Sequence, residues 1–145
     1  ASQAAADRLG IGVSYYPVKD SQELRAALTA ARAAGAEALV LFPDQVTNPN
    51  RAEIAEFALQ HRLPTVSGWS NYADAGHLVT YGPNLRDSYR RTAHYVDRIL
   101  KGASPATLPV ELPTTVELVL NLKTARTLGI AVPRSILVRA DRVIE

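Results

Sequence analysis

The chain has 145 residues, of which 47% are hydrophobic and 21% charged, enough for one globular domain with a real core. Its 16 Lys and Arg against 14 Asp and Glu leave a formal net charge of +2 without a basic run, which argues against nucleic-acid binding. The absence of cysteine excludes disulfides, thiolate nucleophiles and cysteine-ligated metals.

The sequence also lacks a membrane-spanning segment, a signal peptide and an initiator methionine. No apolar stretch approaches the roughly 20 residues of a membrane-spanning helix, and residues 1–3 do not resemble a signal peptide. Methionine is absent, so an initiator is missing too. We therefore expect the chain to be processed or cut from something longer.

The first part of the chain predicts a strand, a helix and a second strand. Residues 11–16 have the pattern of a strand that a proline ends. Asp20 stands three residues before Glu23, the spacing of a capping box, and Gly35 marks the end of the helix that follows. The continuous apolar run 38–42 is typical of a parallel strand that is covered on both faces.

The same order then repeats. Asparagines and a proline within residues 48–51 predict the start of a helix. Residues 63–67 predict a strand whose early proline costs little, and residues 77–81 predict another. Between these two strands, residues 68–76 form a polar and aromatic loop.

The longest predicted helix begins at Asn84 and ends at Gly102. One face carries an apolar stripe, and arginines occupy much of the rest. The stripe consists of Leu85, Tyr89, Ala93, Val96 and Leu100.

After a linker at 104–109, the chain predicts a strand at 118–120 and a short helix that Asn121 caps and Gly129 ends. A turn at a proline then leads into the final residues, 142–145. Strands that alternate with helices at this spacing predict an α/β fold, with a parallel sheet, flanking helices and right-handed crossovers.

Ligands of open α/β sheets bind outside the carboxyl ends of the strands, so we expect function in the loops after Phe42, Ser67 and Tyr81. No catalytic arrangement occurs there. The segment Gly68–Tyr72 lacks the second glycine of a nucleophile elbow, and no glycine-rich phosphate loop is present. We therefore predict no enzyme activity and no cofactor.

The histidines and paired carboxylates also suggest no chemistry. His61, His77 and His94 lie far apart without metal-ligand spacing, so we predict a surface or boundary role for each and no metal site. Glu53 and Glu56 share one helix turn, which we interpret as a solvated face.

The loops do contain groups that suit binding of a small organic solute. Asp44 and Gln45 directly follow a buried strand and offer a carboxylate and an amide. Trp69, Tyr72 and Tyr81 offer flat faces and polar edges near two other strand exits. These five are the candidate ligand-binding residues. Structural alternatives stay open, namely loop capping for Asp44, core filling for Trp69 and packing beside the strand for Tyr81.

The C-terminal third resembles the ending of a known family. The similarity is carried by Leu-Pro-Val-Glu-Leu-Pro-Thr at 108–114, Glu-Leu-Val-Leu-Asn-Leu-Lys-Thr-Ala at 117–125, Leu-Gly-Ile at 128–130, Pro133, and Arg-Ala-Asp-Arg-Val-Ile-Glu at 139–145. Residues 61–64, 81–84 and 95–102 fit the same pattern. The chain resembles ABC-transporter substrate-binding proteins of the tryptophan/tyrosine-transporter-like family over essentially its whole length.

This resemblance implies two α/β lobes of the type I periplasmic-binding fold, with an amino-acid-like solute in the cleft between them and a hinge of crossing strands. It also implies export to the periplasm or another extracytoplasmic space. The solute would be delivered to a membrane permease driven by a cytoplasmic ATPase, and no residue would be catalytic.

By order along the chain, residues 1–76 match the main part of the second, ligand-binding lobe. Residues 77–107 match a hinge-crossing strand and a helix that packs on the first lobe. Residues 108–145 match the return to the second lobe, with a crossing strand near 109–114. The loop at Asp44 matches the family's Asp-containing ligand loop, and Tyr81 matches the hinge segment that faces the cleft.

A complete member is about twice as long, so the resemblance implies that the sheet of the first lobe is missing from this chain. The apolar stripe of the helix at 84–102 would then lack a partner, at a cost of several kcal/mol for about 25 cal/mol per Å² of apolar area. We expect this helix to fold back on its own lobe or to pack against a second copy. Swapping through residues 82–83 and 104–105 would give a homodimer.

Two other classes of function compete with solute transport. The effector-binding half of a periplasmic-binding-protein-like transcriptional regulator or sensor shares the fold by analogy. A small α/β enzyme is disfavoured because no acid–base or nucleophilic pair converges.

Overall fold

The computed structural model describes residues 2–145, so Ala1, with which the predicted lobe 1–76 begins, lies outside the described residues. The strands are β1 (Leu39–Leu41), β2 (Thr65–Ser67), β3 (Val79–Pro83), β4 (Val116–Asn121) and β5 (Arg142–Ile144). The helices are α1 (Ser2–Leu9), α2 (Ser21–Ala33), α3 (Arg51–Gln60), α4 (Ser70–Asp74), α5 (Leu85–Leu100), the 3-10 helix η1 (Pro105–Thr107), α6 (Leu122–Leu128) and α7 (Arg134–Leu137).

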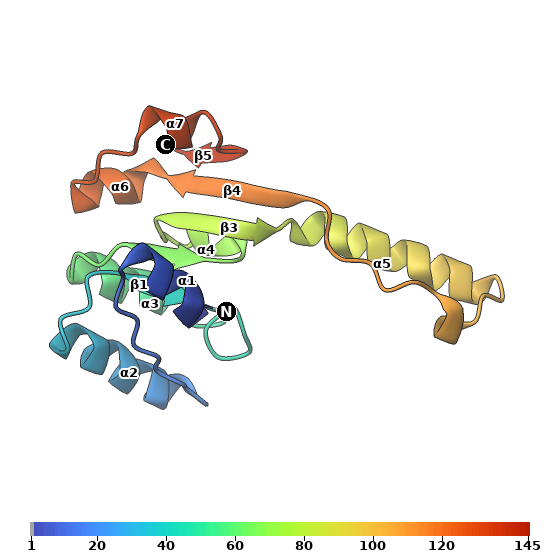
Figure 1. Cartoon of the computed structure of the whole chain (residues 1–145), viewed down its shortest axis with the longest axis horizontal. Coiled ribbons are helices and arrows are strands. Elements are labelled where there is room, and N and C mark those ends of the chain that lie inside the picture. Colours follow the sequence, from blue (N-terminus) through green and yellow to red (C-terminus); the bar gives the residue numbers. More distant parts are fainter. Residues whose placement is uncertain (1) are drawn as a thin grey trace.

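The five strands form one sheet in the order of the chain, β1-β2-β3-β4-β5 (Figure 1). The pairs β1–β2, β2–β3 and β4–β5 are parallel, whereas β3 and β4 are antiparallel. Their ladder runs from Val79 opposite Leu120 to Pro83 opposite Val116. The predicted α/β class with a parallel sheet and flanking helices is confirmed, with the antiparallel pair β3–β4 as the exception.

Local sequence signals place the helix ends. The Asp20 carboxylate accepts the backbone N–H groups of Gln22 and Glu23 at 2.8 Å, and the Glu23 carboxylate accepts that of Lys19 at 2.9 Å. Asp20 is thus the N-cap of α2, but the predicted capping box is incomplete, because Glu23 accepts from Lys19 and not from Asp20 itself. Asn84 likewise caps α5 through the N–H of Asp87 at 3.1 Å.

The packed core lies on one face of the sheet. There Leu24, Leu28 and Ile54, from α2 and α3, pack against Leu39 and Leu41 of β1. Helices α2 and α3 cover only the face of β1 that carries Leu39 and Leu41, because successive side chains of a strand point to opposite faces.

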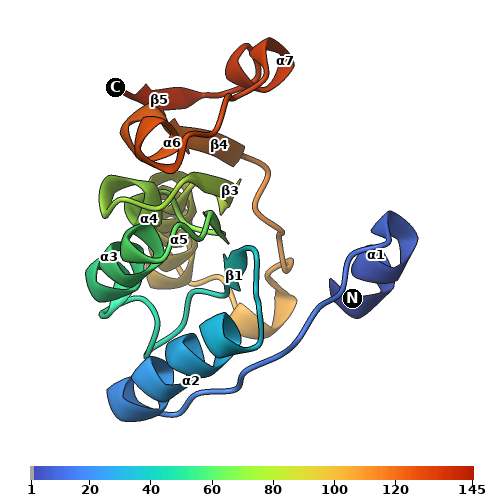
Figure 2. The same ribbon diagram turned by 90° about the vertical axis from the view of Figure 1, so that its left-hand side faces the viewer.

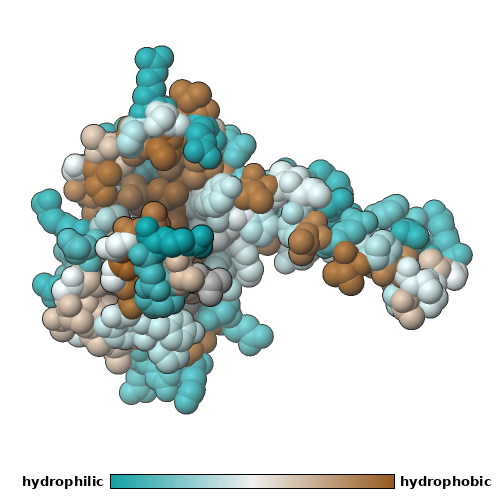
Figure 3. Space-filling view, in the orientation of Figure 1, coloured by the Kyte–Doolittle hydropathy of each residue, from teal (hydrophilic) through white to brown (hydrophobic). Residues whose placement is uncertain are grey.

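The opposite face of β1 is open, contrary to the prediction that residues 38–42 are covered on both sides. Val40 is 64% exposed and Phe42 55%. Figure 2 shows α3 and α4 on one side of the sheet, with α1 away from it on the other. Apolar residues accordingly gather over the sheet on the body of the molecule (Figure 3).

The predicted strand at 11–16 is wrong for this structure. The segment is irregular, and no backbone hydrogen bond joins it to β1 within the described residues. A strand needs a hydrogen-bonded partner strand. Residues 11–16 instead connect α2 to α1, which lies apart from the body (Figure 2). Tyr15 is therefore 77% exposed.

Residues 84–115 form an arm that projects from the body (Figure 1). Helix α5 contains no buried residue, so the expectation that it folds back on its own lobe is wrong. Its contacts are with the returning segment, where the Tyr95 hydroxyl donates to the Pro109 carbonyl at 2.7 Å and Arg91 pairs with Glu111 at 3.2 Å. The homodimer stays a prediction.

The crossing strand predicted near 109–114 is also wrong. Those residues run beside α5 without strand pairing, and β4 begins only at Val116. Pro109 and Pro113 have no N–H to donate, and β3 ends at Pro83, opposite Val116. Within residues 2–145 no helix is long and apolar enough to cross a membrane.

Candidate functional site at the carboxyl edge of the sheet

Three strand ends meet at one edge of the sheet. Since β1, β2 and β3 are parallel, their carboxyl ends lie side by side. A Cβ placed on Gly82 would lie 2.0 Å from the Gly68 carbonyl oxygen, and one on Gly68 would lie 3.7 Å from the Pro43 ring. Gly82, Gly68 and Pro43 therefore let the segments at the ends of β3, β2 and β1 approach one another closely.

The five candidate residues divide between this edge and the interior. Asp44 and Gln45 are exposed after β1, Trp69 is half-buried after β2, and Tyr81 is 62% exposed near the end of β3. The fold thus brings four of the five candidate residues to the neighbouring ends of β1, β2 and β3. Tyr72 is 0% exposed, so its side chain belongs to the core of this structure.

Asp44 caps its own loop, which was the alternative to ligand binding. Its Oδ1 accepts the backbone N–H of Val46 at 2.8 Å and that of Thr47 at 2.6 Å. Hydrogen bonds from Thr47 first, and from Val46, hold the pKa of the Asp44 carboxyl below its usual value. The group is therefore a carboxylate at neutral pH, and among the described residues its Oδ2 has no hydrogen-bond partner.

Thr47, which the sequence analysis missed, is the centre of this loop. It is 7% exposed, and its hydroxyl accepts from the Asp44 N–H and from the Tyr72 hydroxyl, each at 3.0 Å. The proton of this hydroxyl faces two acceptors, the Phe42 carbonyl oxygen at 2.7 Å and Asp44 Oδ1 at 3.0 Å. The spacing Asp-x-x-Thr after a strand is the signal that would have found it, because such pairs close short turns.

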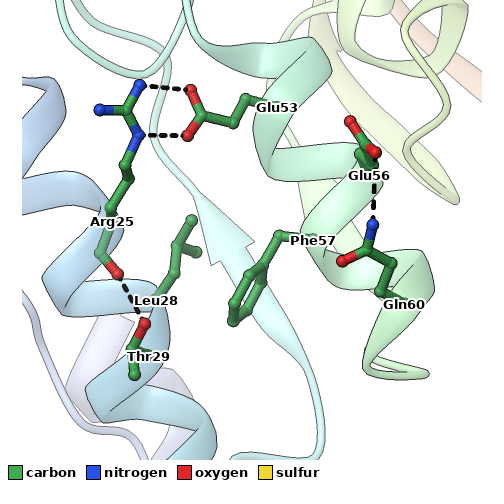
Figure 4. Close-up of a pocket in the computed structure, with 7 residues that line it drawn as sticks. All are labelled: Arg25, Leu28, Thr29, Glu53, Glu56, Phe57 and Gln60. Carbon is green, nitrogen blue, oxygen red and sulfur yellow. Dashed lines mark hydrogen bonds and ion pairs between the residues drawn. The ribbon is translucent and has the colours of Figure 1, made fainter.

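A shallow hollow lies elsewhere, between α2 and α3 (Figure 4). It has a volume of ≈ 310 Å³, and Phe57 and Leu28 reach into it. At its rim Glu53 pairs with Arg25, with Oε2 3.2 Å from Nη2. None of the five candidate residues lines this hollow, and both carboxylates predicted to be solvated, Glu53 and Glu56, stand beside it.

The predicted surface or boundary role is wrong for His77. Its side chain is 0% exposed, and Nε2 donates to the carbonyl of Arg51 at 2.8 Å. Its ring lies 5.0 Å from that of Tyr72, between centroids. His61 is half-buried against Phe57 and His94 is exposed, as expected of boundary and surface residues. Within residues 2–145, no three His, Asp or Glu side chains gather to bind a metal.

Burial of His77 predicts that acidification weakens the fold. Desolvation lowers the pKa of His77 below its ordinary value of 6.5, so the unfolded chain binds a proton before the folded one does. The stability that neutral His77 contributes is fully present above about pH 6.5. It is lost as the pH falls toward the pKa of His77 in the folded chain, at about 1.4 kcal/mol for each pH unit between the unfolded and folded pKa values. We expect urea unfolding to show lower stability at pH 5 than at pH 7.

The variant His77→Phe should flatten that pH dependence, while His94→Gln should leave it intact. An unchanged slope in His77→Phe would assign the acid sensitivity to another group.

Comparison with known proteins establishes the family. The model of the family "ABC transporter substrate binding protein" matches residues 2–144. The chain therefore belongs to this family. No curated protein sequence matches it.

Solved structures agree with this assignment. A conserved domain protein from Vibrio cholerae O1 biovar El Tor is 25% identical, with a TM-score of 0.90 over 97% of this chain. The ABC domain from Streptococcus pneumoniae in complex with L-Trp is 26% identical, with a TM-score of 0.90 over 97%. A ligand-free, open substrate-binding protein with adhesive properties from Clostridium difficile, at 19% identity and TM-score 0.68 over 99%, shares the fold. This chain covers only 47%, 48% and 48% of those chains, respectively.

Proposed function

We propose that this chain is the second lobe of a solute-binding component of an ABC importer. The whole protein has the type I arrangement of two lobes and acts outside the cytoplasm. It holds an amino-acid-like organic solute in the interlobe cleft and delivers it to a membrane permease without chemical change.

The observation that carries this proposal is the open edge where β1, β2 and β3 end. It presents a carboxylate at Asp44 and aromatic surface at Trp69 and Tyr81, and among residues 2–145 the hollow between α2 and α3 does not include these residues. The family match supports solute binding by the whole protein, and the similar pneumococcal domain was solved in complex with L-Trp. An edge of this kind supplies one wall of a cleft, and the remaining wall comes from the other half of the protein.

Calorimetric titration tests the proposal with L-Trp, L-Tyr and a panel of aliphatic and acidic amino acids. We expect the full-length protein to bind one of them with a Kd in the micromolar range or below. The 145-residue chain should bind at least about 100-fold more weakly, because it keeps only half of the contacts. Tight binding by the isolated chain, or no binding by the full-length protein, would overturn the proposal.

Substitutions at the edge give a sharper test in the full-length protein. Asp44→Asn and Trp69→Ala should each weaken binding about 10-fold or more, since each removes a charged or stacking contact worth over 1 kcal/mol. Gln60→Ala, in the hollow between α2 and α3, is the matched control and should bind as the parent does.

A further inference from the structure

We propose that Thr47 is a positioning residue, whose hydroxyl fixes the Asp44 carboxylate and couples the loop after β1 to helix α4 and Trp69. The inference rests on the proposed function for its consequence in solute binding. The positioning itself concerns only residues of this chain.

The hydroxyl of Thr47 uses its full hydrogen-bonding capacity. It accepts from two donors, the Asp44 N–H and the Tyr72 hydroxyl. Its single proton faces two acceptors, the Phe42 carbonyl at 2.7 Å and Asp44 Oδ1 at 3.0 Å. The buried Thr47 hydroxyl thus contacts Phe42 just after β1, Asp44 at the start of the turn, and Tyr72 of α4.

Tyr72 extends this connection to the next strand exit. Its N–H donates to the Trp69 carbonyl at 3.0 Å, so its ring and the backbone of Trp69 belong to one turn. A second bond runs in parallel, from the Asn71 side-chain amide to Asn48 Oδ1 at 2.9 Å. The loops after β1 and β2 therefore form one hydrogen-bonded unit, to which the bond between Tyr72 and Thr47 contributes.

Loss of the hydroxyl should release this unit, because valine has the shape of threonine but neither donates nor accepts. The Tyr72 hydroxyl and the Asp44 N–H would then lose their acceptor in the interior, where unpaired polar groups are costly. The loop can regain water for these groups only by opening. Opening would also separate Asp44 Oδ1 from the N–H groups of Val46 and Thr47.

The test compares Thr47→Val with Thr47→Ser, which keeps the hydroxyl, and with Thr127→Val on the exposed face of α6 as control. Carboxyl-detected NMR titration of the 145-residue chain should show the Asp44 pKa rising toward the ordinary aspartate value in Thr47→Val only. Amide exchange of Val46 should accelerate at least 10-fold in the same variant. In the full-length protein, L-Trp affinity should fall about 10-fold in Thr47→Val and less than 2-fold in Thr47→Ser.

Each result decides a separate claim. An unchanged Asp44 pKa and unchanged Val46 exchange in folded Thr47→Val would overturn the positioning role. Equal effects of Thr47→Val and Thr47→Ser would overturn it too, because the serine variant keeps the hydroxyl and its effect would come from altered packing. If neither L-Trp nor any other amino acid binds the parent full-length protein, the proposed function fails, while the titration still decides the role of Thr47.

Discussion

Replacing Gly82 with alanine is expected to destabilise the fold by about 3 kcal/mol or more, among the largest effects of any single substitution here. The new Cβ would lie 2.0 Å from the carbonyl oxygen and 2.8 Å from the carbonyl carbon of Gly68. Both obstacles are backbone atoms, so no side-chain rotation can relieve the contact. The strands β2 and β3 would have to separate at the edge that carries the candidate site, and urea unfolding measures the cost.

Gly12→Ala is the matched control for this substitution. Nothing lies within 4 Å of a Cβ at Gly12, and its backbone, like that of Gly82, is not left-handed. Its free energy of unfolding should change by less than about 0.5 kcal/mol. Equal stability of the two variants would show that β2 and β3 separate at this edge without cost.

The second large effect is expected at Asn121, where replacement by alanine should cost about 2 kcal/mol. Its Oδ1 accepts the N–H of Thr124 at 3.1 Å and caps α6, while its Nδ2 donates to the Ala73 carbonyl at 3.0 Å. The side chain is 5% exposed, so water cannot replace these bonds in place. Thermal and urea unfolding should agree on the loss.

Asn84→Ala serves as the comparison, because Asn84 also caps a helix and makes a second bond, from its Nδ2 to the Glu117 carboxylate at 2.9 Å, but is half-buried rather than buried. Its loss should cost about 1 kcal/mol or less, because water can replace both bonds at a half-buried position. If both variants lost the same amount, the burial of the Asn121 bonds would contribute nothing to stability.

The sequence predicted well those features that depend on neighbours along the chain. The N-cap at Asp20, the start of α5 after Asn84, and the helix between Asn121 and Gly129 all depend on groups within four residues of each other. The left-handed φ of +73° at Gly129 is the local geometry that its glycine permits. Such signals need no knowledge of the rest of the fold.

Features that depend on distant segments were missed. Residues 11–16 have the composition of a strand, but a ladder needs a partner, and composition cannot supply one. The open face of Val40 and the burial of His77 likewise follow from which helices cover which part of the sheet. At the site, strand order placed Asp44, Trp69 and Tyr81 at neighbouring exits. The burial of Tyr72 and its hydrogen bond to Thr47 could not be predicted, because they depend on how α4 packs against the loop after β1.

The way the arm joins the body determines how the two move together. Outgoing β3 and incoming β4 are hydrogen-bonded neighbours through Pro83 and Val116, and just beyond them the N–H of Asn84 donates to the Thr115 carbonyl at 3.0 Å. A paired ribbon resists pivoting about any single bond and deforms mainly by twisting along its length. A torque applied to the far end of α5 should therefore enter the sheet through Pro83 and Val116 and pass to Gly82 and Tyr81, the next residues of β3, at the mouth of the site.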